Sequence, residues 1–118
     1  MKFENLIVYQ KSYELALSLY RFSNELPKEE KYGIVSQIKR ASLSVPLNIA
    51  EGHGKQSSND EFNRFLSMAK GSCSEIRVLL SFVKDLGYLK EEAYEKYYER
   101  YEELEKMLYG LMKTVKGE

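Results

Sequence analysis

Apolar residues recur at intervals of three and four positions along four stretches of the chain, at about residues 6–25, 29–52, 58–87 and 90–115. This spacing places the apolar side chains of each stretch on one face of an α-helix. The connections are short, so successive helices are expected to pack as antiparallel neighbours. The pattern therefore predicts an all-α fold, an antiparallel up-and-down four-helix bundle, formed by residues 1–118 as a single domain.

Several residues mark where these helices begin, bend and end. Pro27 disfavours the helical conformation for Leu26 before it, which predicts the end of the first helix there. Pro46 lies inside the second stretch, where it removes a backbone donor and predicts a kink in that helix. Ser58 with Glu61 has the spacing of a capping box at the start of the third helix. Gly87 suits the left-handed backbone conformation that closes a helix at its C-terminal end.

The apolar arcs of the first and fourth stretches are wider than one neighbouring helix needs. Because monomers rarely leave large apolar patches in water, this width predicts a homo-oligomer. Four tyrosines contribute to the fourth arc at helical spacing. Their position favours the core or a subunit interface, and base-stacking platforms are the alternative. These residues are Tyr94, Tyr97, Tyr98 and Tyr101.

Charge is balanced over the chain, with 18 basic and 18 acidic residues among 118 and a pI near 6.6. This balance argues against a protein that coats nucleic acid broadly, which usually has a strong basic excess. Residues 28–55, which include the second stretch, are locally basic, with five basic residues against three acidic ones. They form either a solvated face or a phosphate-binding patch. The basic residues are Lys28, Lys31, Lys39, Arg40 and Lys55.

The sequence offers no catalytic constellation, cofactor motif or metal site. Cys73, the one cysteine, falls in the middle of an apolar stripe, where cysteine behaves as a small hydrophobe. His53 is the one histidine, so the paired Glu-x-x-His motifs of di-metal bundles are excluded. The N-terminus lacks the pattern of a signal peptide, and no apolar run has the length of a membrane span. We expect a cytoplasmic protein with no membrane partner.

A set of polar residues accompanies the apolar stripes of the second and third helices. Asn48 lies three positions after Val45, beside the apolar stripe, and a buried polar group requires a partner. One interpretation is a hydrogen-bonded network that fixes helix register; the other is a ligand or RNA site. The small side chains of residues 71–73 are expected to allow close helix approach. The candidate network comprises Arg40, Asn48, Glu51, Ser72 and Glu75.

Three motifs stand in order: Gln-Ile-Lys-Arg-Ala-Ser-Leu-Ser-Val at 37–45, Asn-Ile-Ala-Glu-Gly at 48–52, and Gly-Ser-Cys-Ser-Glu at 71–75. This combination resembles the 23S rRNA intervening-sequence proteins. The resemblance implies four-helix bundles that assemble as homopentamers, some encoded within insertions of ribosomal RNA genes. Similar accessory proteins of diversity-generating retroelements bind a reverse transcriptase and nucleic acid. They are markedly basic, whereas this chain is neutral.

The expected function is that of a non-enzymatic, oligomeric scaffold or accessory protein. Its expected partners are further copies of itself, five in all, together with weakly bound RNA or DNA and a nucleic-acid-processing protein. The preference for nucleic acid rests on the resemblance. The alternative is a protein–protein adaptor that makes no contact with nucleic acid.

Overall fold

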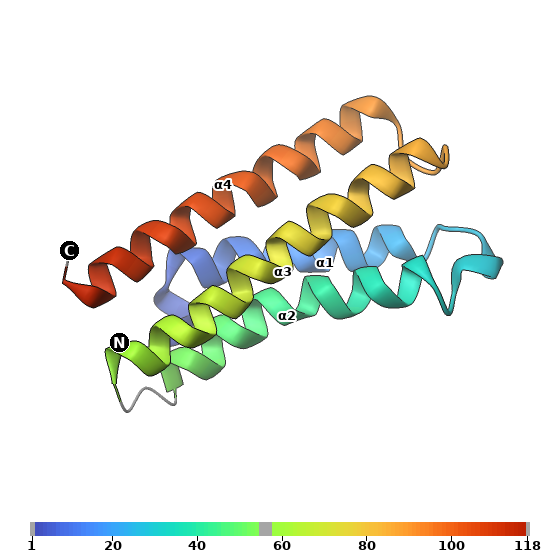
Figure 1. Cartoon of the computed structure of the whole chain (residues 1–118). Helices are drawn as coiled ribbons and strands as arrows, with labels where there is room; N and C mark the ends of the chain where they lie inside the picture. Colours follow the sequence, from blue (N-terminus) through green and yellow to red (C-terminus); the bar gives the residue numbers. More distant parts are fainter. Residues whose placement is uncertain (1, 55–57, 118) are drawn as a thin grey trace.

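A computed structural model describes residues 2–54 and 58–117 of the chain. Four long helices run up and down and leave both chain ends at the same end of the molecule (Figure 1). The molecule measures 44 × 23 × 20 Å, and no strand occurs among the described residues. The predicted four-helix bundle is confirmed. The helices are α1 (Ile7–Ser23), α2 (Ile34–Gly54), α3 (Asn59–Asp85) and α4 (Glu91–Lys116), with 3-10 turns η1 (Phe3–Asn5) and η2 (Lys28–Glu30).

The start of the second helix differs from the prediction. Lys28–Glu30 forms the separate 3-10 turn η2, and α2 begins at Ile34 rather than near Glu29. The chain turns before Gly33, whose carbonyl accepts a hydrogen bond from the backbone N–H of Gln37 at 3.1 Å. Glycine is a poor helix former, so the helix starts only after it.

The other helix ends follow their sequence signals. The side chain of Ser58 accepts a hydrogen bond from the backbone N–H of Glu61 at 3.1 Å, which caps α3. Gly87 has a φ of 85°, and the N–H of Tyr88 donates to the carbonyl of Val83, which completes a Schellman motif. α2 continues through Pro46 to Gly54, so the proline does not end it. The kink at Pro46 stays a prediction.

Every helix contributes to one hydrophobic core, and most of its members come from the predicted apolar stripes. α3 packs against both α2 and α4 along its length, whereas the contacts between α1 and α4 are few. Figure 1 shows α4 lying beside α3. The largest fully buried side chains are Leu19, Ile38, Ile49, Leu66, Ile76, Leu80, Tyr101, Leu104 and Leu108.

One glycine controls how closely α2 and α3 approach. Gly52 is buried, and a Cβ built on it would lie 2.5 Å from the Cβ of Phe65 and 3.2 Å from a ring carbon of Phe62. Gly110, in the C-terminal part of α4, has open space where a Cβ would stand. Gly52 is therefore required for packing, whereas Gly110 is not.

Gly52→Ala is expected to lower the free energy of unfolding by about 1–3 kcal/mol, because the methyl group forces α2 away from Phe65. Gly110→Ala, the matched control, is expected to stabilise the protein by about 0.5–1 kcal/mol through its helix propensity. Urea melts of both variants measure these changes. A neutral Gly52→Ala would show that the seam between α2 and α3 is loosely packed.

Candidate functional site

A ladder of polar contacts lines the seam between α2 and α3. The Arg40 guanidinium forms an ion pair with the Glu75 carboxylate at 3.2 Å. One turn further, the Ser72 hydroxyl donates to the Ser44 hydroxyl at 2.9 Å. The Asn48 amide donates to the carbonyl and the hydroxyl of Ser44, at 2.8 and 2.9 Å. Residues 40, 44 and 48 follow one row of α2, so the ladder fixes the register of the two helices.

Asn48 and Glu51 are less buried than a buried polar network would require. Asn48 reaches Ser72 through Ser44, and Asn48 is half-buried rather than buried. Glu51 is exposed one turn beyond Asn48. The pKa of Arg64 is raised, chiefly by its hydrogen bond and charge contact with Glu61 and to a smaller extent by the charge of Glu51. Glu51 therefore faces the N-terminal part of α3.

The three small residues on α3 do not act together. Ser72 and Cys73 face the bundle interior, whereas a Cβ on Gly71 would meet nothing within 4 Å. The expectation that Gly71 permits close helix approach is wrong, since Gly71 lies on the outer face of α3. The close approach comes from Gly52 instead.

The basic residues of the second stretch do not form one surface. Lys28 and Lys31 are exposed at η2, beside Glu29 and Glu30. The Lys39 ammonium donates to the Asn24 side chain at 2.7 Å and lies 4.5 Å from the centre of the Tyr20 ring. Lys39 therefore turns towards α1, whereas Arg40 turns towards α3. Lys55 lies outside the described residues.

A partly buried ion pair joins α3 and α4. The Arg77 guanidinium contacts the Glu105 carboxylate, which is only 8% exposed, and donates to the Tyr98 hydroxyl at 2.9 Å. The Ser74 hydroxyl also donates to Glu105. The hydrogen bond to Glu105 raises the pKa of Arg77. Sequence analysis missed this pair, although Glu105 stands within the apolar stripe between Tyr101 and Leu108.

An exposed tyrosine on α4 lies between two lysines. Tyr109 is 51% exposed, and the ammonium groups of Lys70 and Lys113 lie 5.6 and 4.8 Å from its ring centre. Lys70, Lys106, Tyr109, Arg77, Glu102 and Glu105 line a shallow recess of about 380 Å³. We call Lys70, Lys106, Tyr109 and Lys113 the lysine–tyrosine face.

The lysine–tyrosine face is positive although the chain is neutral. Glu105 compensates Arg77, and none of the three lysines forms an ion pair with a described residue. Only Glu102 adds a negative charge to the recess. An aromatic ring beside unpaired ammonium groups can stack on a nucleobase while the lysines contact phosphate.

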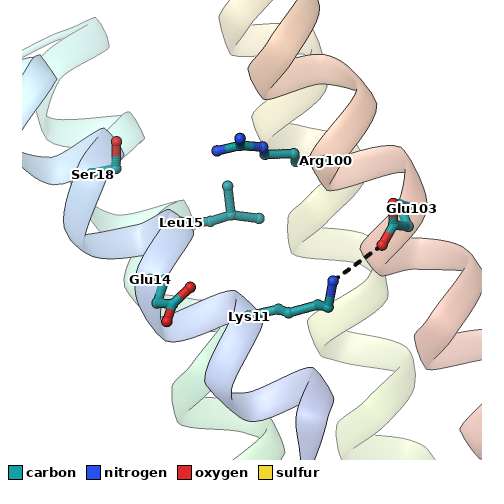
Figure 2. A pocket seen from close by; sticks show the side chains of 6 residues that line it. All are labelled: Lys11, Glu14, Leu15, Ser18, Arg100 and Glu103. Atoms are coloured by element: carbon teal, nitrogen blue, oxygen red, sulfur yellow. Dashed lines mark hydrogen bonds and ion pairs between the residues drawn. The ribbon is translucent and has the colours of Figure 1, made fainter.

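The seam between α1 and α4 holds a polar recess of about 370 Å³ (Figure 2). The Lys11 ammonium forms an ion pair with Glu103 at 3.3 Å. Figure 2 shows Arg100 extending from α4 towards Ser18 of α1. Lys11 and Arg100 face Glu14 and Glu103, so the two signs of charge balance here. This recess does not select for an anion.

Two apolar surfaces are uncovered. A groove of about 640 Å³ runs between α1 and α2, lined entirely by uncharged residues. On α3, Val78 and Phe82 are each more than half exposed, and so is Leu86, the C-cap of that helix. We call these the α1–α2 groove and the α3 ridge. The groove is lined by Phe3, Tyr9, Tyr13, Ala16, Leu17, Tyr20, Leu43, Pro46, Leu47 and Ala50.

The described residues contain no arrangement suited to covalent or metal chemistry. Cys73 is fully buried, and burial raises the pKa of its thiol to about 12, which keeps it protonated at neutral pH. His53 packs edge-on against Phe62, with ring centres 5.8 Å apart. Across residues 2–54 and 58–117, no group of three His, Cys, Asp or Glu side chains is placed to hold a metal ion.

The family model described as 23S rRNA-intervening sequence protein matches residues 4–110. The chain belongs to this family. A solved structure from Bacteroides thetaiotaomicron, a protein of unknown function from the S23 ribosomal protein family, superposes with a TM-score of 0.79. The two sequences are 27% identical, and the match covers 91% of this chain and 99% of the Bacteroides chain.

Among functionally curated proteins, none matches this intervening-sequence protein. In the part of the chain that the structure describes, no helix has the length and apolar character needed to cross a membrane. Neither the family description nor the structural relative names a catalytic activity.

Arg77→Met is expected to lower the free energy of unfolding by about 2–4 kcal/mol, because it leaves the buried Glu105 carboxylate without its counter-charge. Arg77→Met combined with Glu105→Leu should recover most of that loss, since no buried charge is then unpaired. Lys11→Met, which breaks an exposed pair, should cost less than about 1 kcal/mol. Denaturant melts measure all three. Equal losses for Arg77→Met and Lys11→Met would contradict the structural role of the Arg77–Glu105 pair.

Proposed function

We propose that this intervening-sequence protein is a non-enzymatic, homo-oligomeric scaffold or accessory protein that binds RNA or DNA weakly through the lysine–tyrosine face. The observation that carries the proposal is the placement of Tyr109 between Lys70 and Lys113. In a chain with equal numbers of basic and acidic residues, attraction to phosphate requires such uneven placement. The family description refers to intervening sequences of 23S rRNA, and this association motivates nucleic acid as the partner class.

The physical basis of binding is stacking combined with counterion release. One base stacked on an aromatic ring contributes about 1–3 kcal/mol, independently of sequence. Each phosphate neutralised by a lysine releases counterions, so affinity falls steeply with salt. With three lysines and one tyrosine, a single copy binds weakly and without sequence preference.

Assembly turns a weak face into a stronger one. Copies that present the lysine–tyrosine face on one particle raise the effective concentration for a second contact to the same strand. We propose five copies, as the family resemblance implies, and a cytoplasmic location. A nucleic-acid-processing protein that binds the same strand would add contacts of its own.

A specific observation favours the alternative, an adaptor without nucleic-acid contact. The Lys39 and Arg40 side chains are engaged by Asn24 and Glu75, on opposite sides of α2. Of the described basic residues of this region, Arg40 is compensated by Glu75 and Lys39 faces α1, which weakens the case for one basic surface here. If the lysine–tyrosine face does not bind nucleic acid either, the uncovered apolar surfaces favour a function that rests on protein partners alone.

Two variants with the same change in charge test the nucleic-acid proposal. Lys70→Glu with Lys113→Glu should abolish binding of a fluorescent single-stranded oligonucleotide at low salt, whereas Lys28→Glu with Lys31→Glu should leave most of it. Anisotropy across a salt series measures the affinity. Tyr109→Phe should bind as the wild type does, and Tyr109→Ala should lose about 1–3 kcal/mol because the stacking surface is removed.

The outcomes separate the two functions. Equal weakening by both lysine pairs would mean that binding follows net charge and that the lysine–tyrosine face is no site. If the wild-type protein binds neither RNA nor DNA at low salt, the nucleic-acid proposal fails and the adaptor stands. Affinity that persists at high salt would contradict the counterion-release account.

A further inference from the structure

We infer that copies of this chain join through unlike surfaces, with the α3 ridge of one copy seated in the α1–α2 groove of the next. The inference rests on the homo-oligomer of the proposed function and adds the surfaces that meet. It follows from the two uncovered apolar surfaces, which differ in shape and lie on different helices.

The α3 ridge is a projecting line of side chains. Val78, Phe82 and Leu86 are spaced by four residues and follow one row along the end of α3. Their exposed fractions are 57, 57 and 51%, although each is large and apolar. Phe82 is the largest of the three and projects the greatest apolar area.

The α1–α2 groove is the hollow counterpart. Tyr13 and Leu47, both more than half exposed, stand on its two sides, one on each helix. The small or compact side chains of Ala16, Pro46 and Ala50 lie among them. The groove has a volume of about 640 Å³ and a lining without charged side chains.

The exposed apolar area suits a specific interface. Seven large apolar side chains of the two surfaces are 41–63% exposed, so at roughly 150–200 Å² each they expose on the order of 500–700 Å². A standard interface buries about 1,200–2,000 Å² in total, of which a little over half is apolar. One ridge meeting one groove therefore supplies apolar area at the lower end of what such an interface needs.

Charge and symmetry favour this pairing over others. Neither surface includes a charged side chain, which disfavours nucleic acid as the occupant of either. A symmetric pairing of groove with groove would set two hollows against each other and leave both ridges uncovered. Pairing unlike surfaces covers both, and a heterologous contact of this kind propagates until a ring closes or a filament grows.

The lysine–tyrosine face is compatible with this contact. Its residues lie on α4 and on the α4-facing side of α3, whereas the ridge occupies the end of α3 next to the turn at Gly87. The recess beside Tyr109 and the α1–α2 groove have no lining residue in common. Assembly through ridge and groove therefore leaves the nucleic-acid face accessible on every copy.

Complementation of two blocked variants tests the inference. Leu47→Glu blocks the groove and Phe82→Glu blocks the ridge, because each puts a charge into an apolar contact. Light scattering after size exclusion should give each variant the mass of one chain, 13.8 kDa. An equimolar mixture should give about twice that mass, because the free ridge of the groove variant fits the free groove of the ridge variant. Tyr32→Glu, at an exposed tyrosine outside both surfaces, should keep the wild-type mass.

Each result supports or overturns a stated claim. A monomeric wild-type protein would refute the homo-oligomer and this inference together. If the wild type is oligomeric and the mixture stays monomeric, or if either blocked variant keeps the wild-type mass, only the pairing of ridge with groove is refuted. Circular dichroism checks that the variants are folded. If the glutamates unfold the chain, the two single variants Leu47→Ser and Phe82→Ser take their place in the same test.

Discussion

The contact of Gly52 with Phe65 sets the distance between α2 and α3, and much of the molecule follows from that distance. A side chain larger than hydrogen at residue 52 would push the two helices apart. With the helices close together, Ser44 meets Ser72 and Arg40 meets Glu75, and these polar contacts permit one register. The register then decides which residues of α2 and α3 face the core and which face outward. The α3 ridge lies on the part of α3 that this arrangement leaves facing outward.

Local chemistry made most of the fold predictable from the sequence. The helical period identified four helices, and Ser58 and Gly87 marked their ends because capping depends on neighbouring residues alone. The start of α2 at Ile34 was missed, since Glu29 and Glu30 also fit the first turn of a helix. The ridge was missed although the helical period places it: Val78 and Phe82 each follow a buried residue, Ile76 and Leu80, by two positions and so lie on the opposite side of α3.

The site was less predictable than the fold because it depends on contacts between distant residues. Glu105 is charged and was not expected in the interior, where Arg77, 28 positions earlier, compensates it. The basic residues from Lys28 to Lys55 are close in sequence, yet Lys39 and Arg40 project to opposite neighbours. Lys70 and Lys113 are 43 positions apart and meet at one tyrosine. Only the packing of α3 against α4 brings these two lysines together.

The central claim is that several copies assemble and that each copy presents one weak nucleic-acid face. Native mass spectrometry with a short single-stranded oligonucleotide at low ionic strength tests both parts in one measurement. The account predicts particles of more than one chain, most abundantly five, that take up several oligonucleotides, at most one per chain. Single chains without oligonucleotide would contradict the account in both parts.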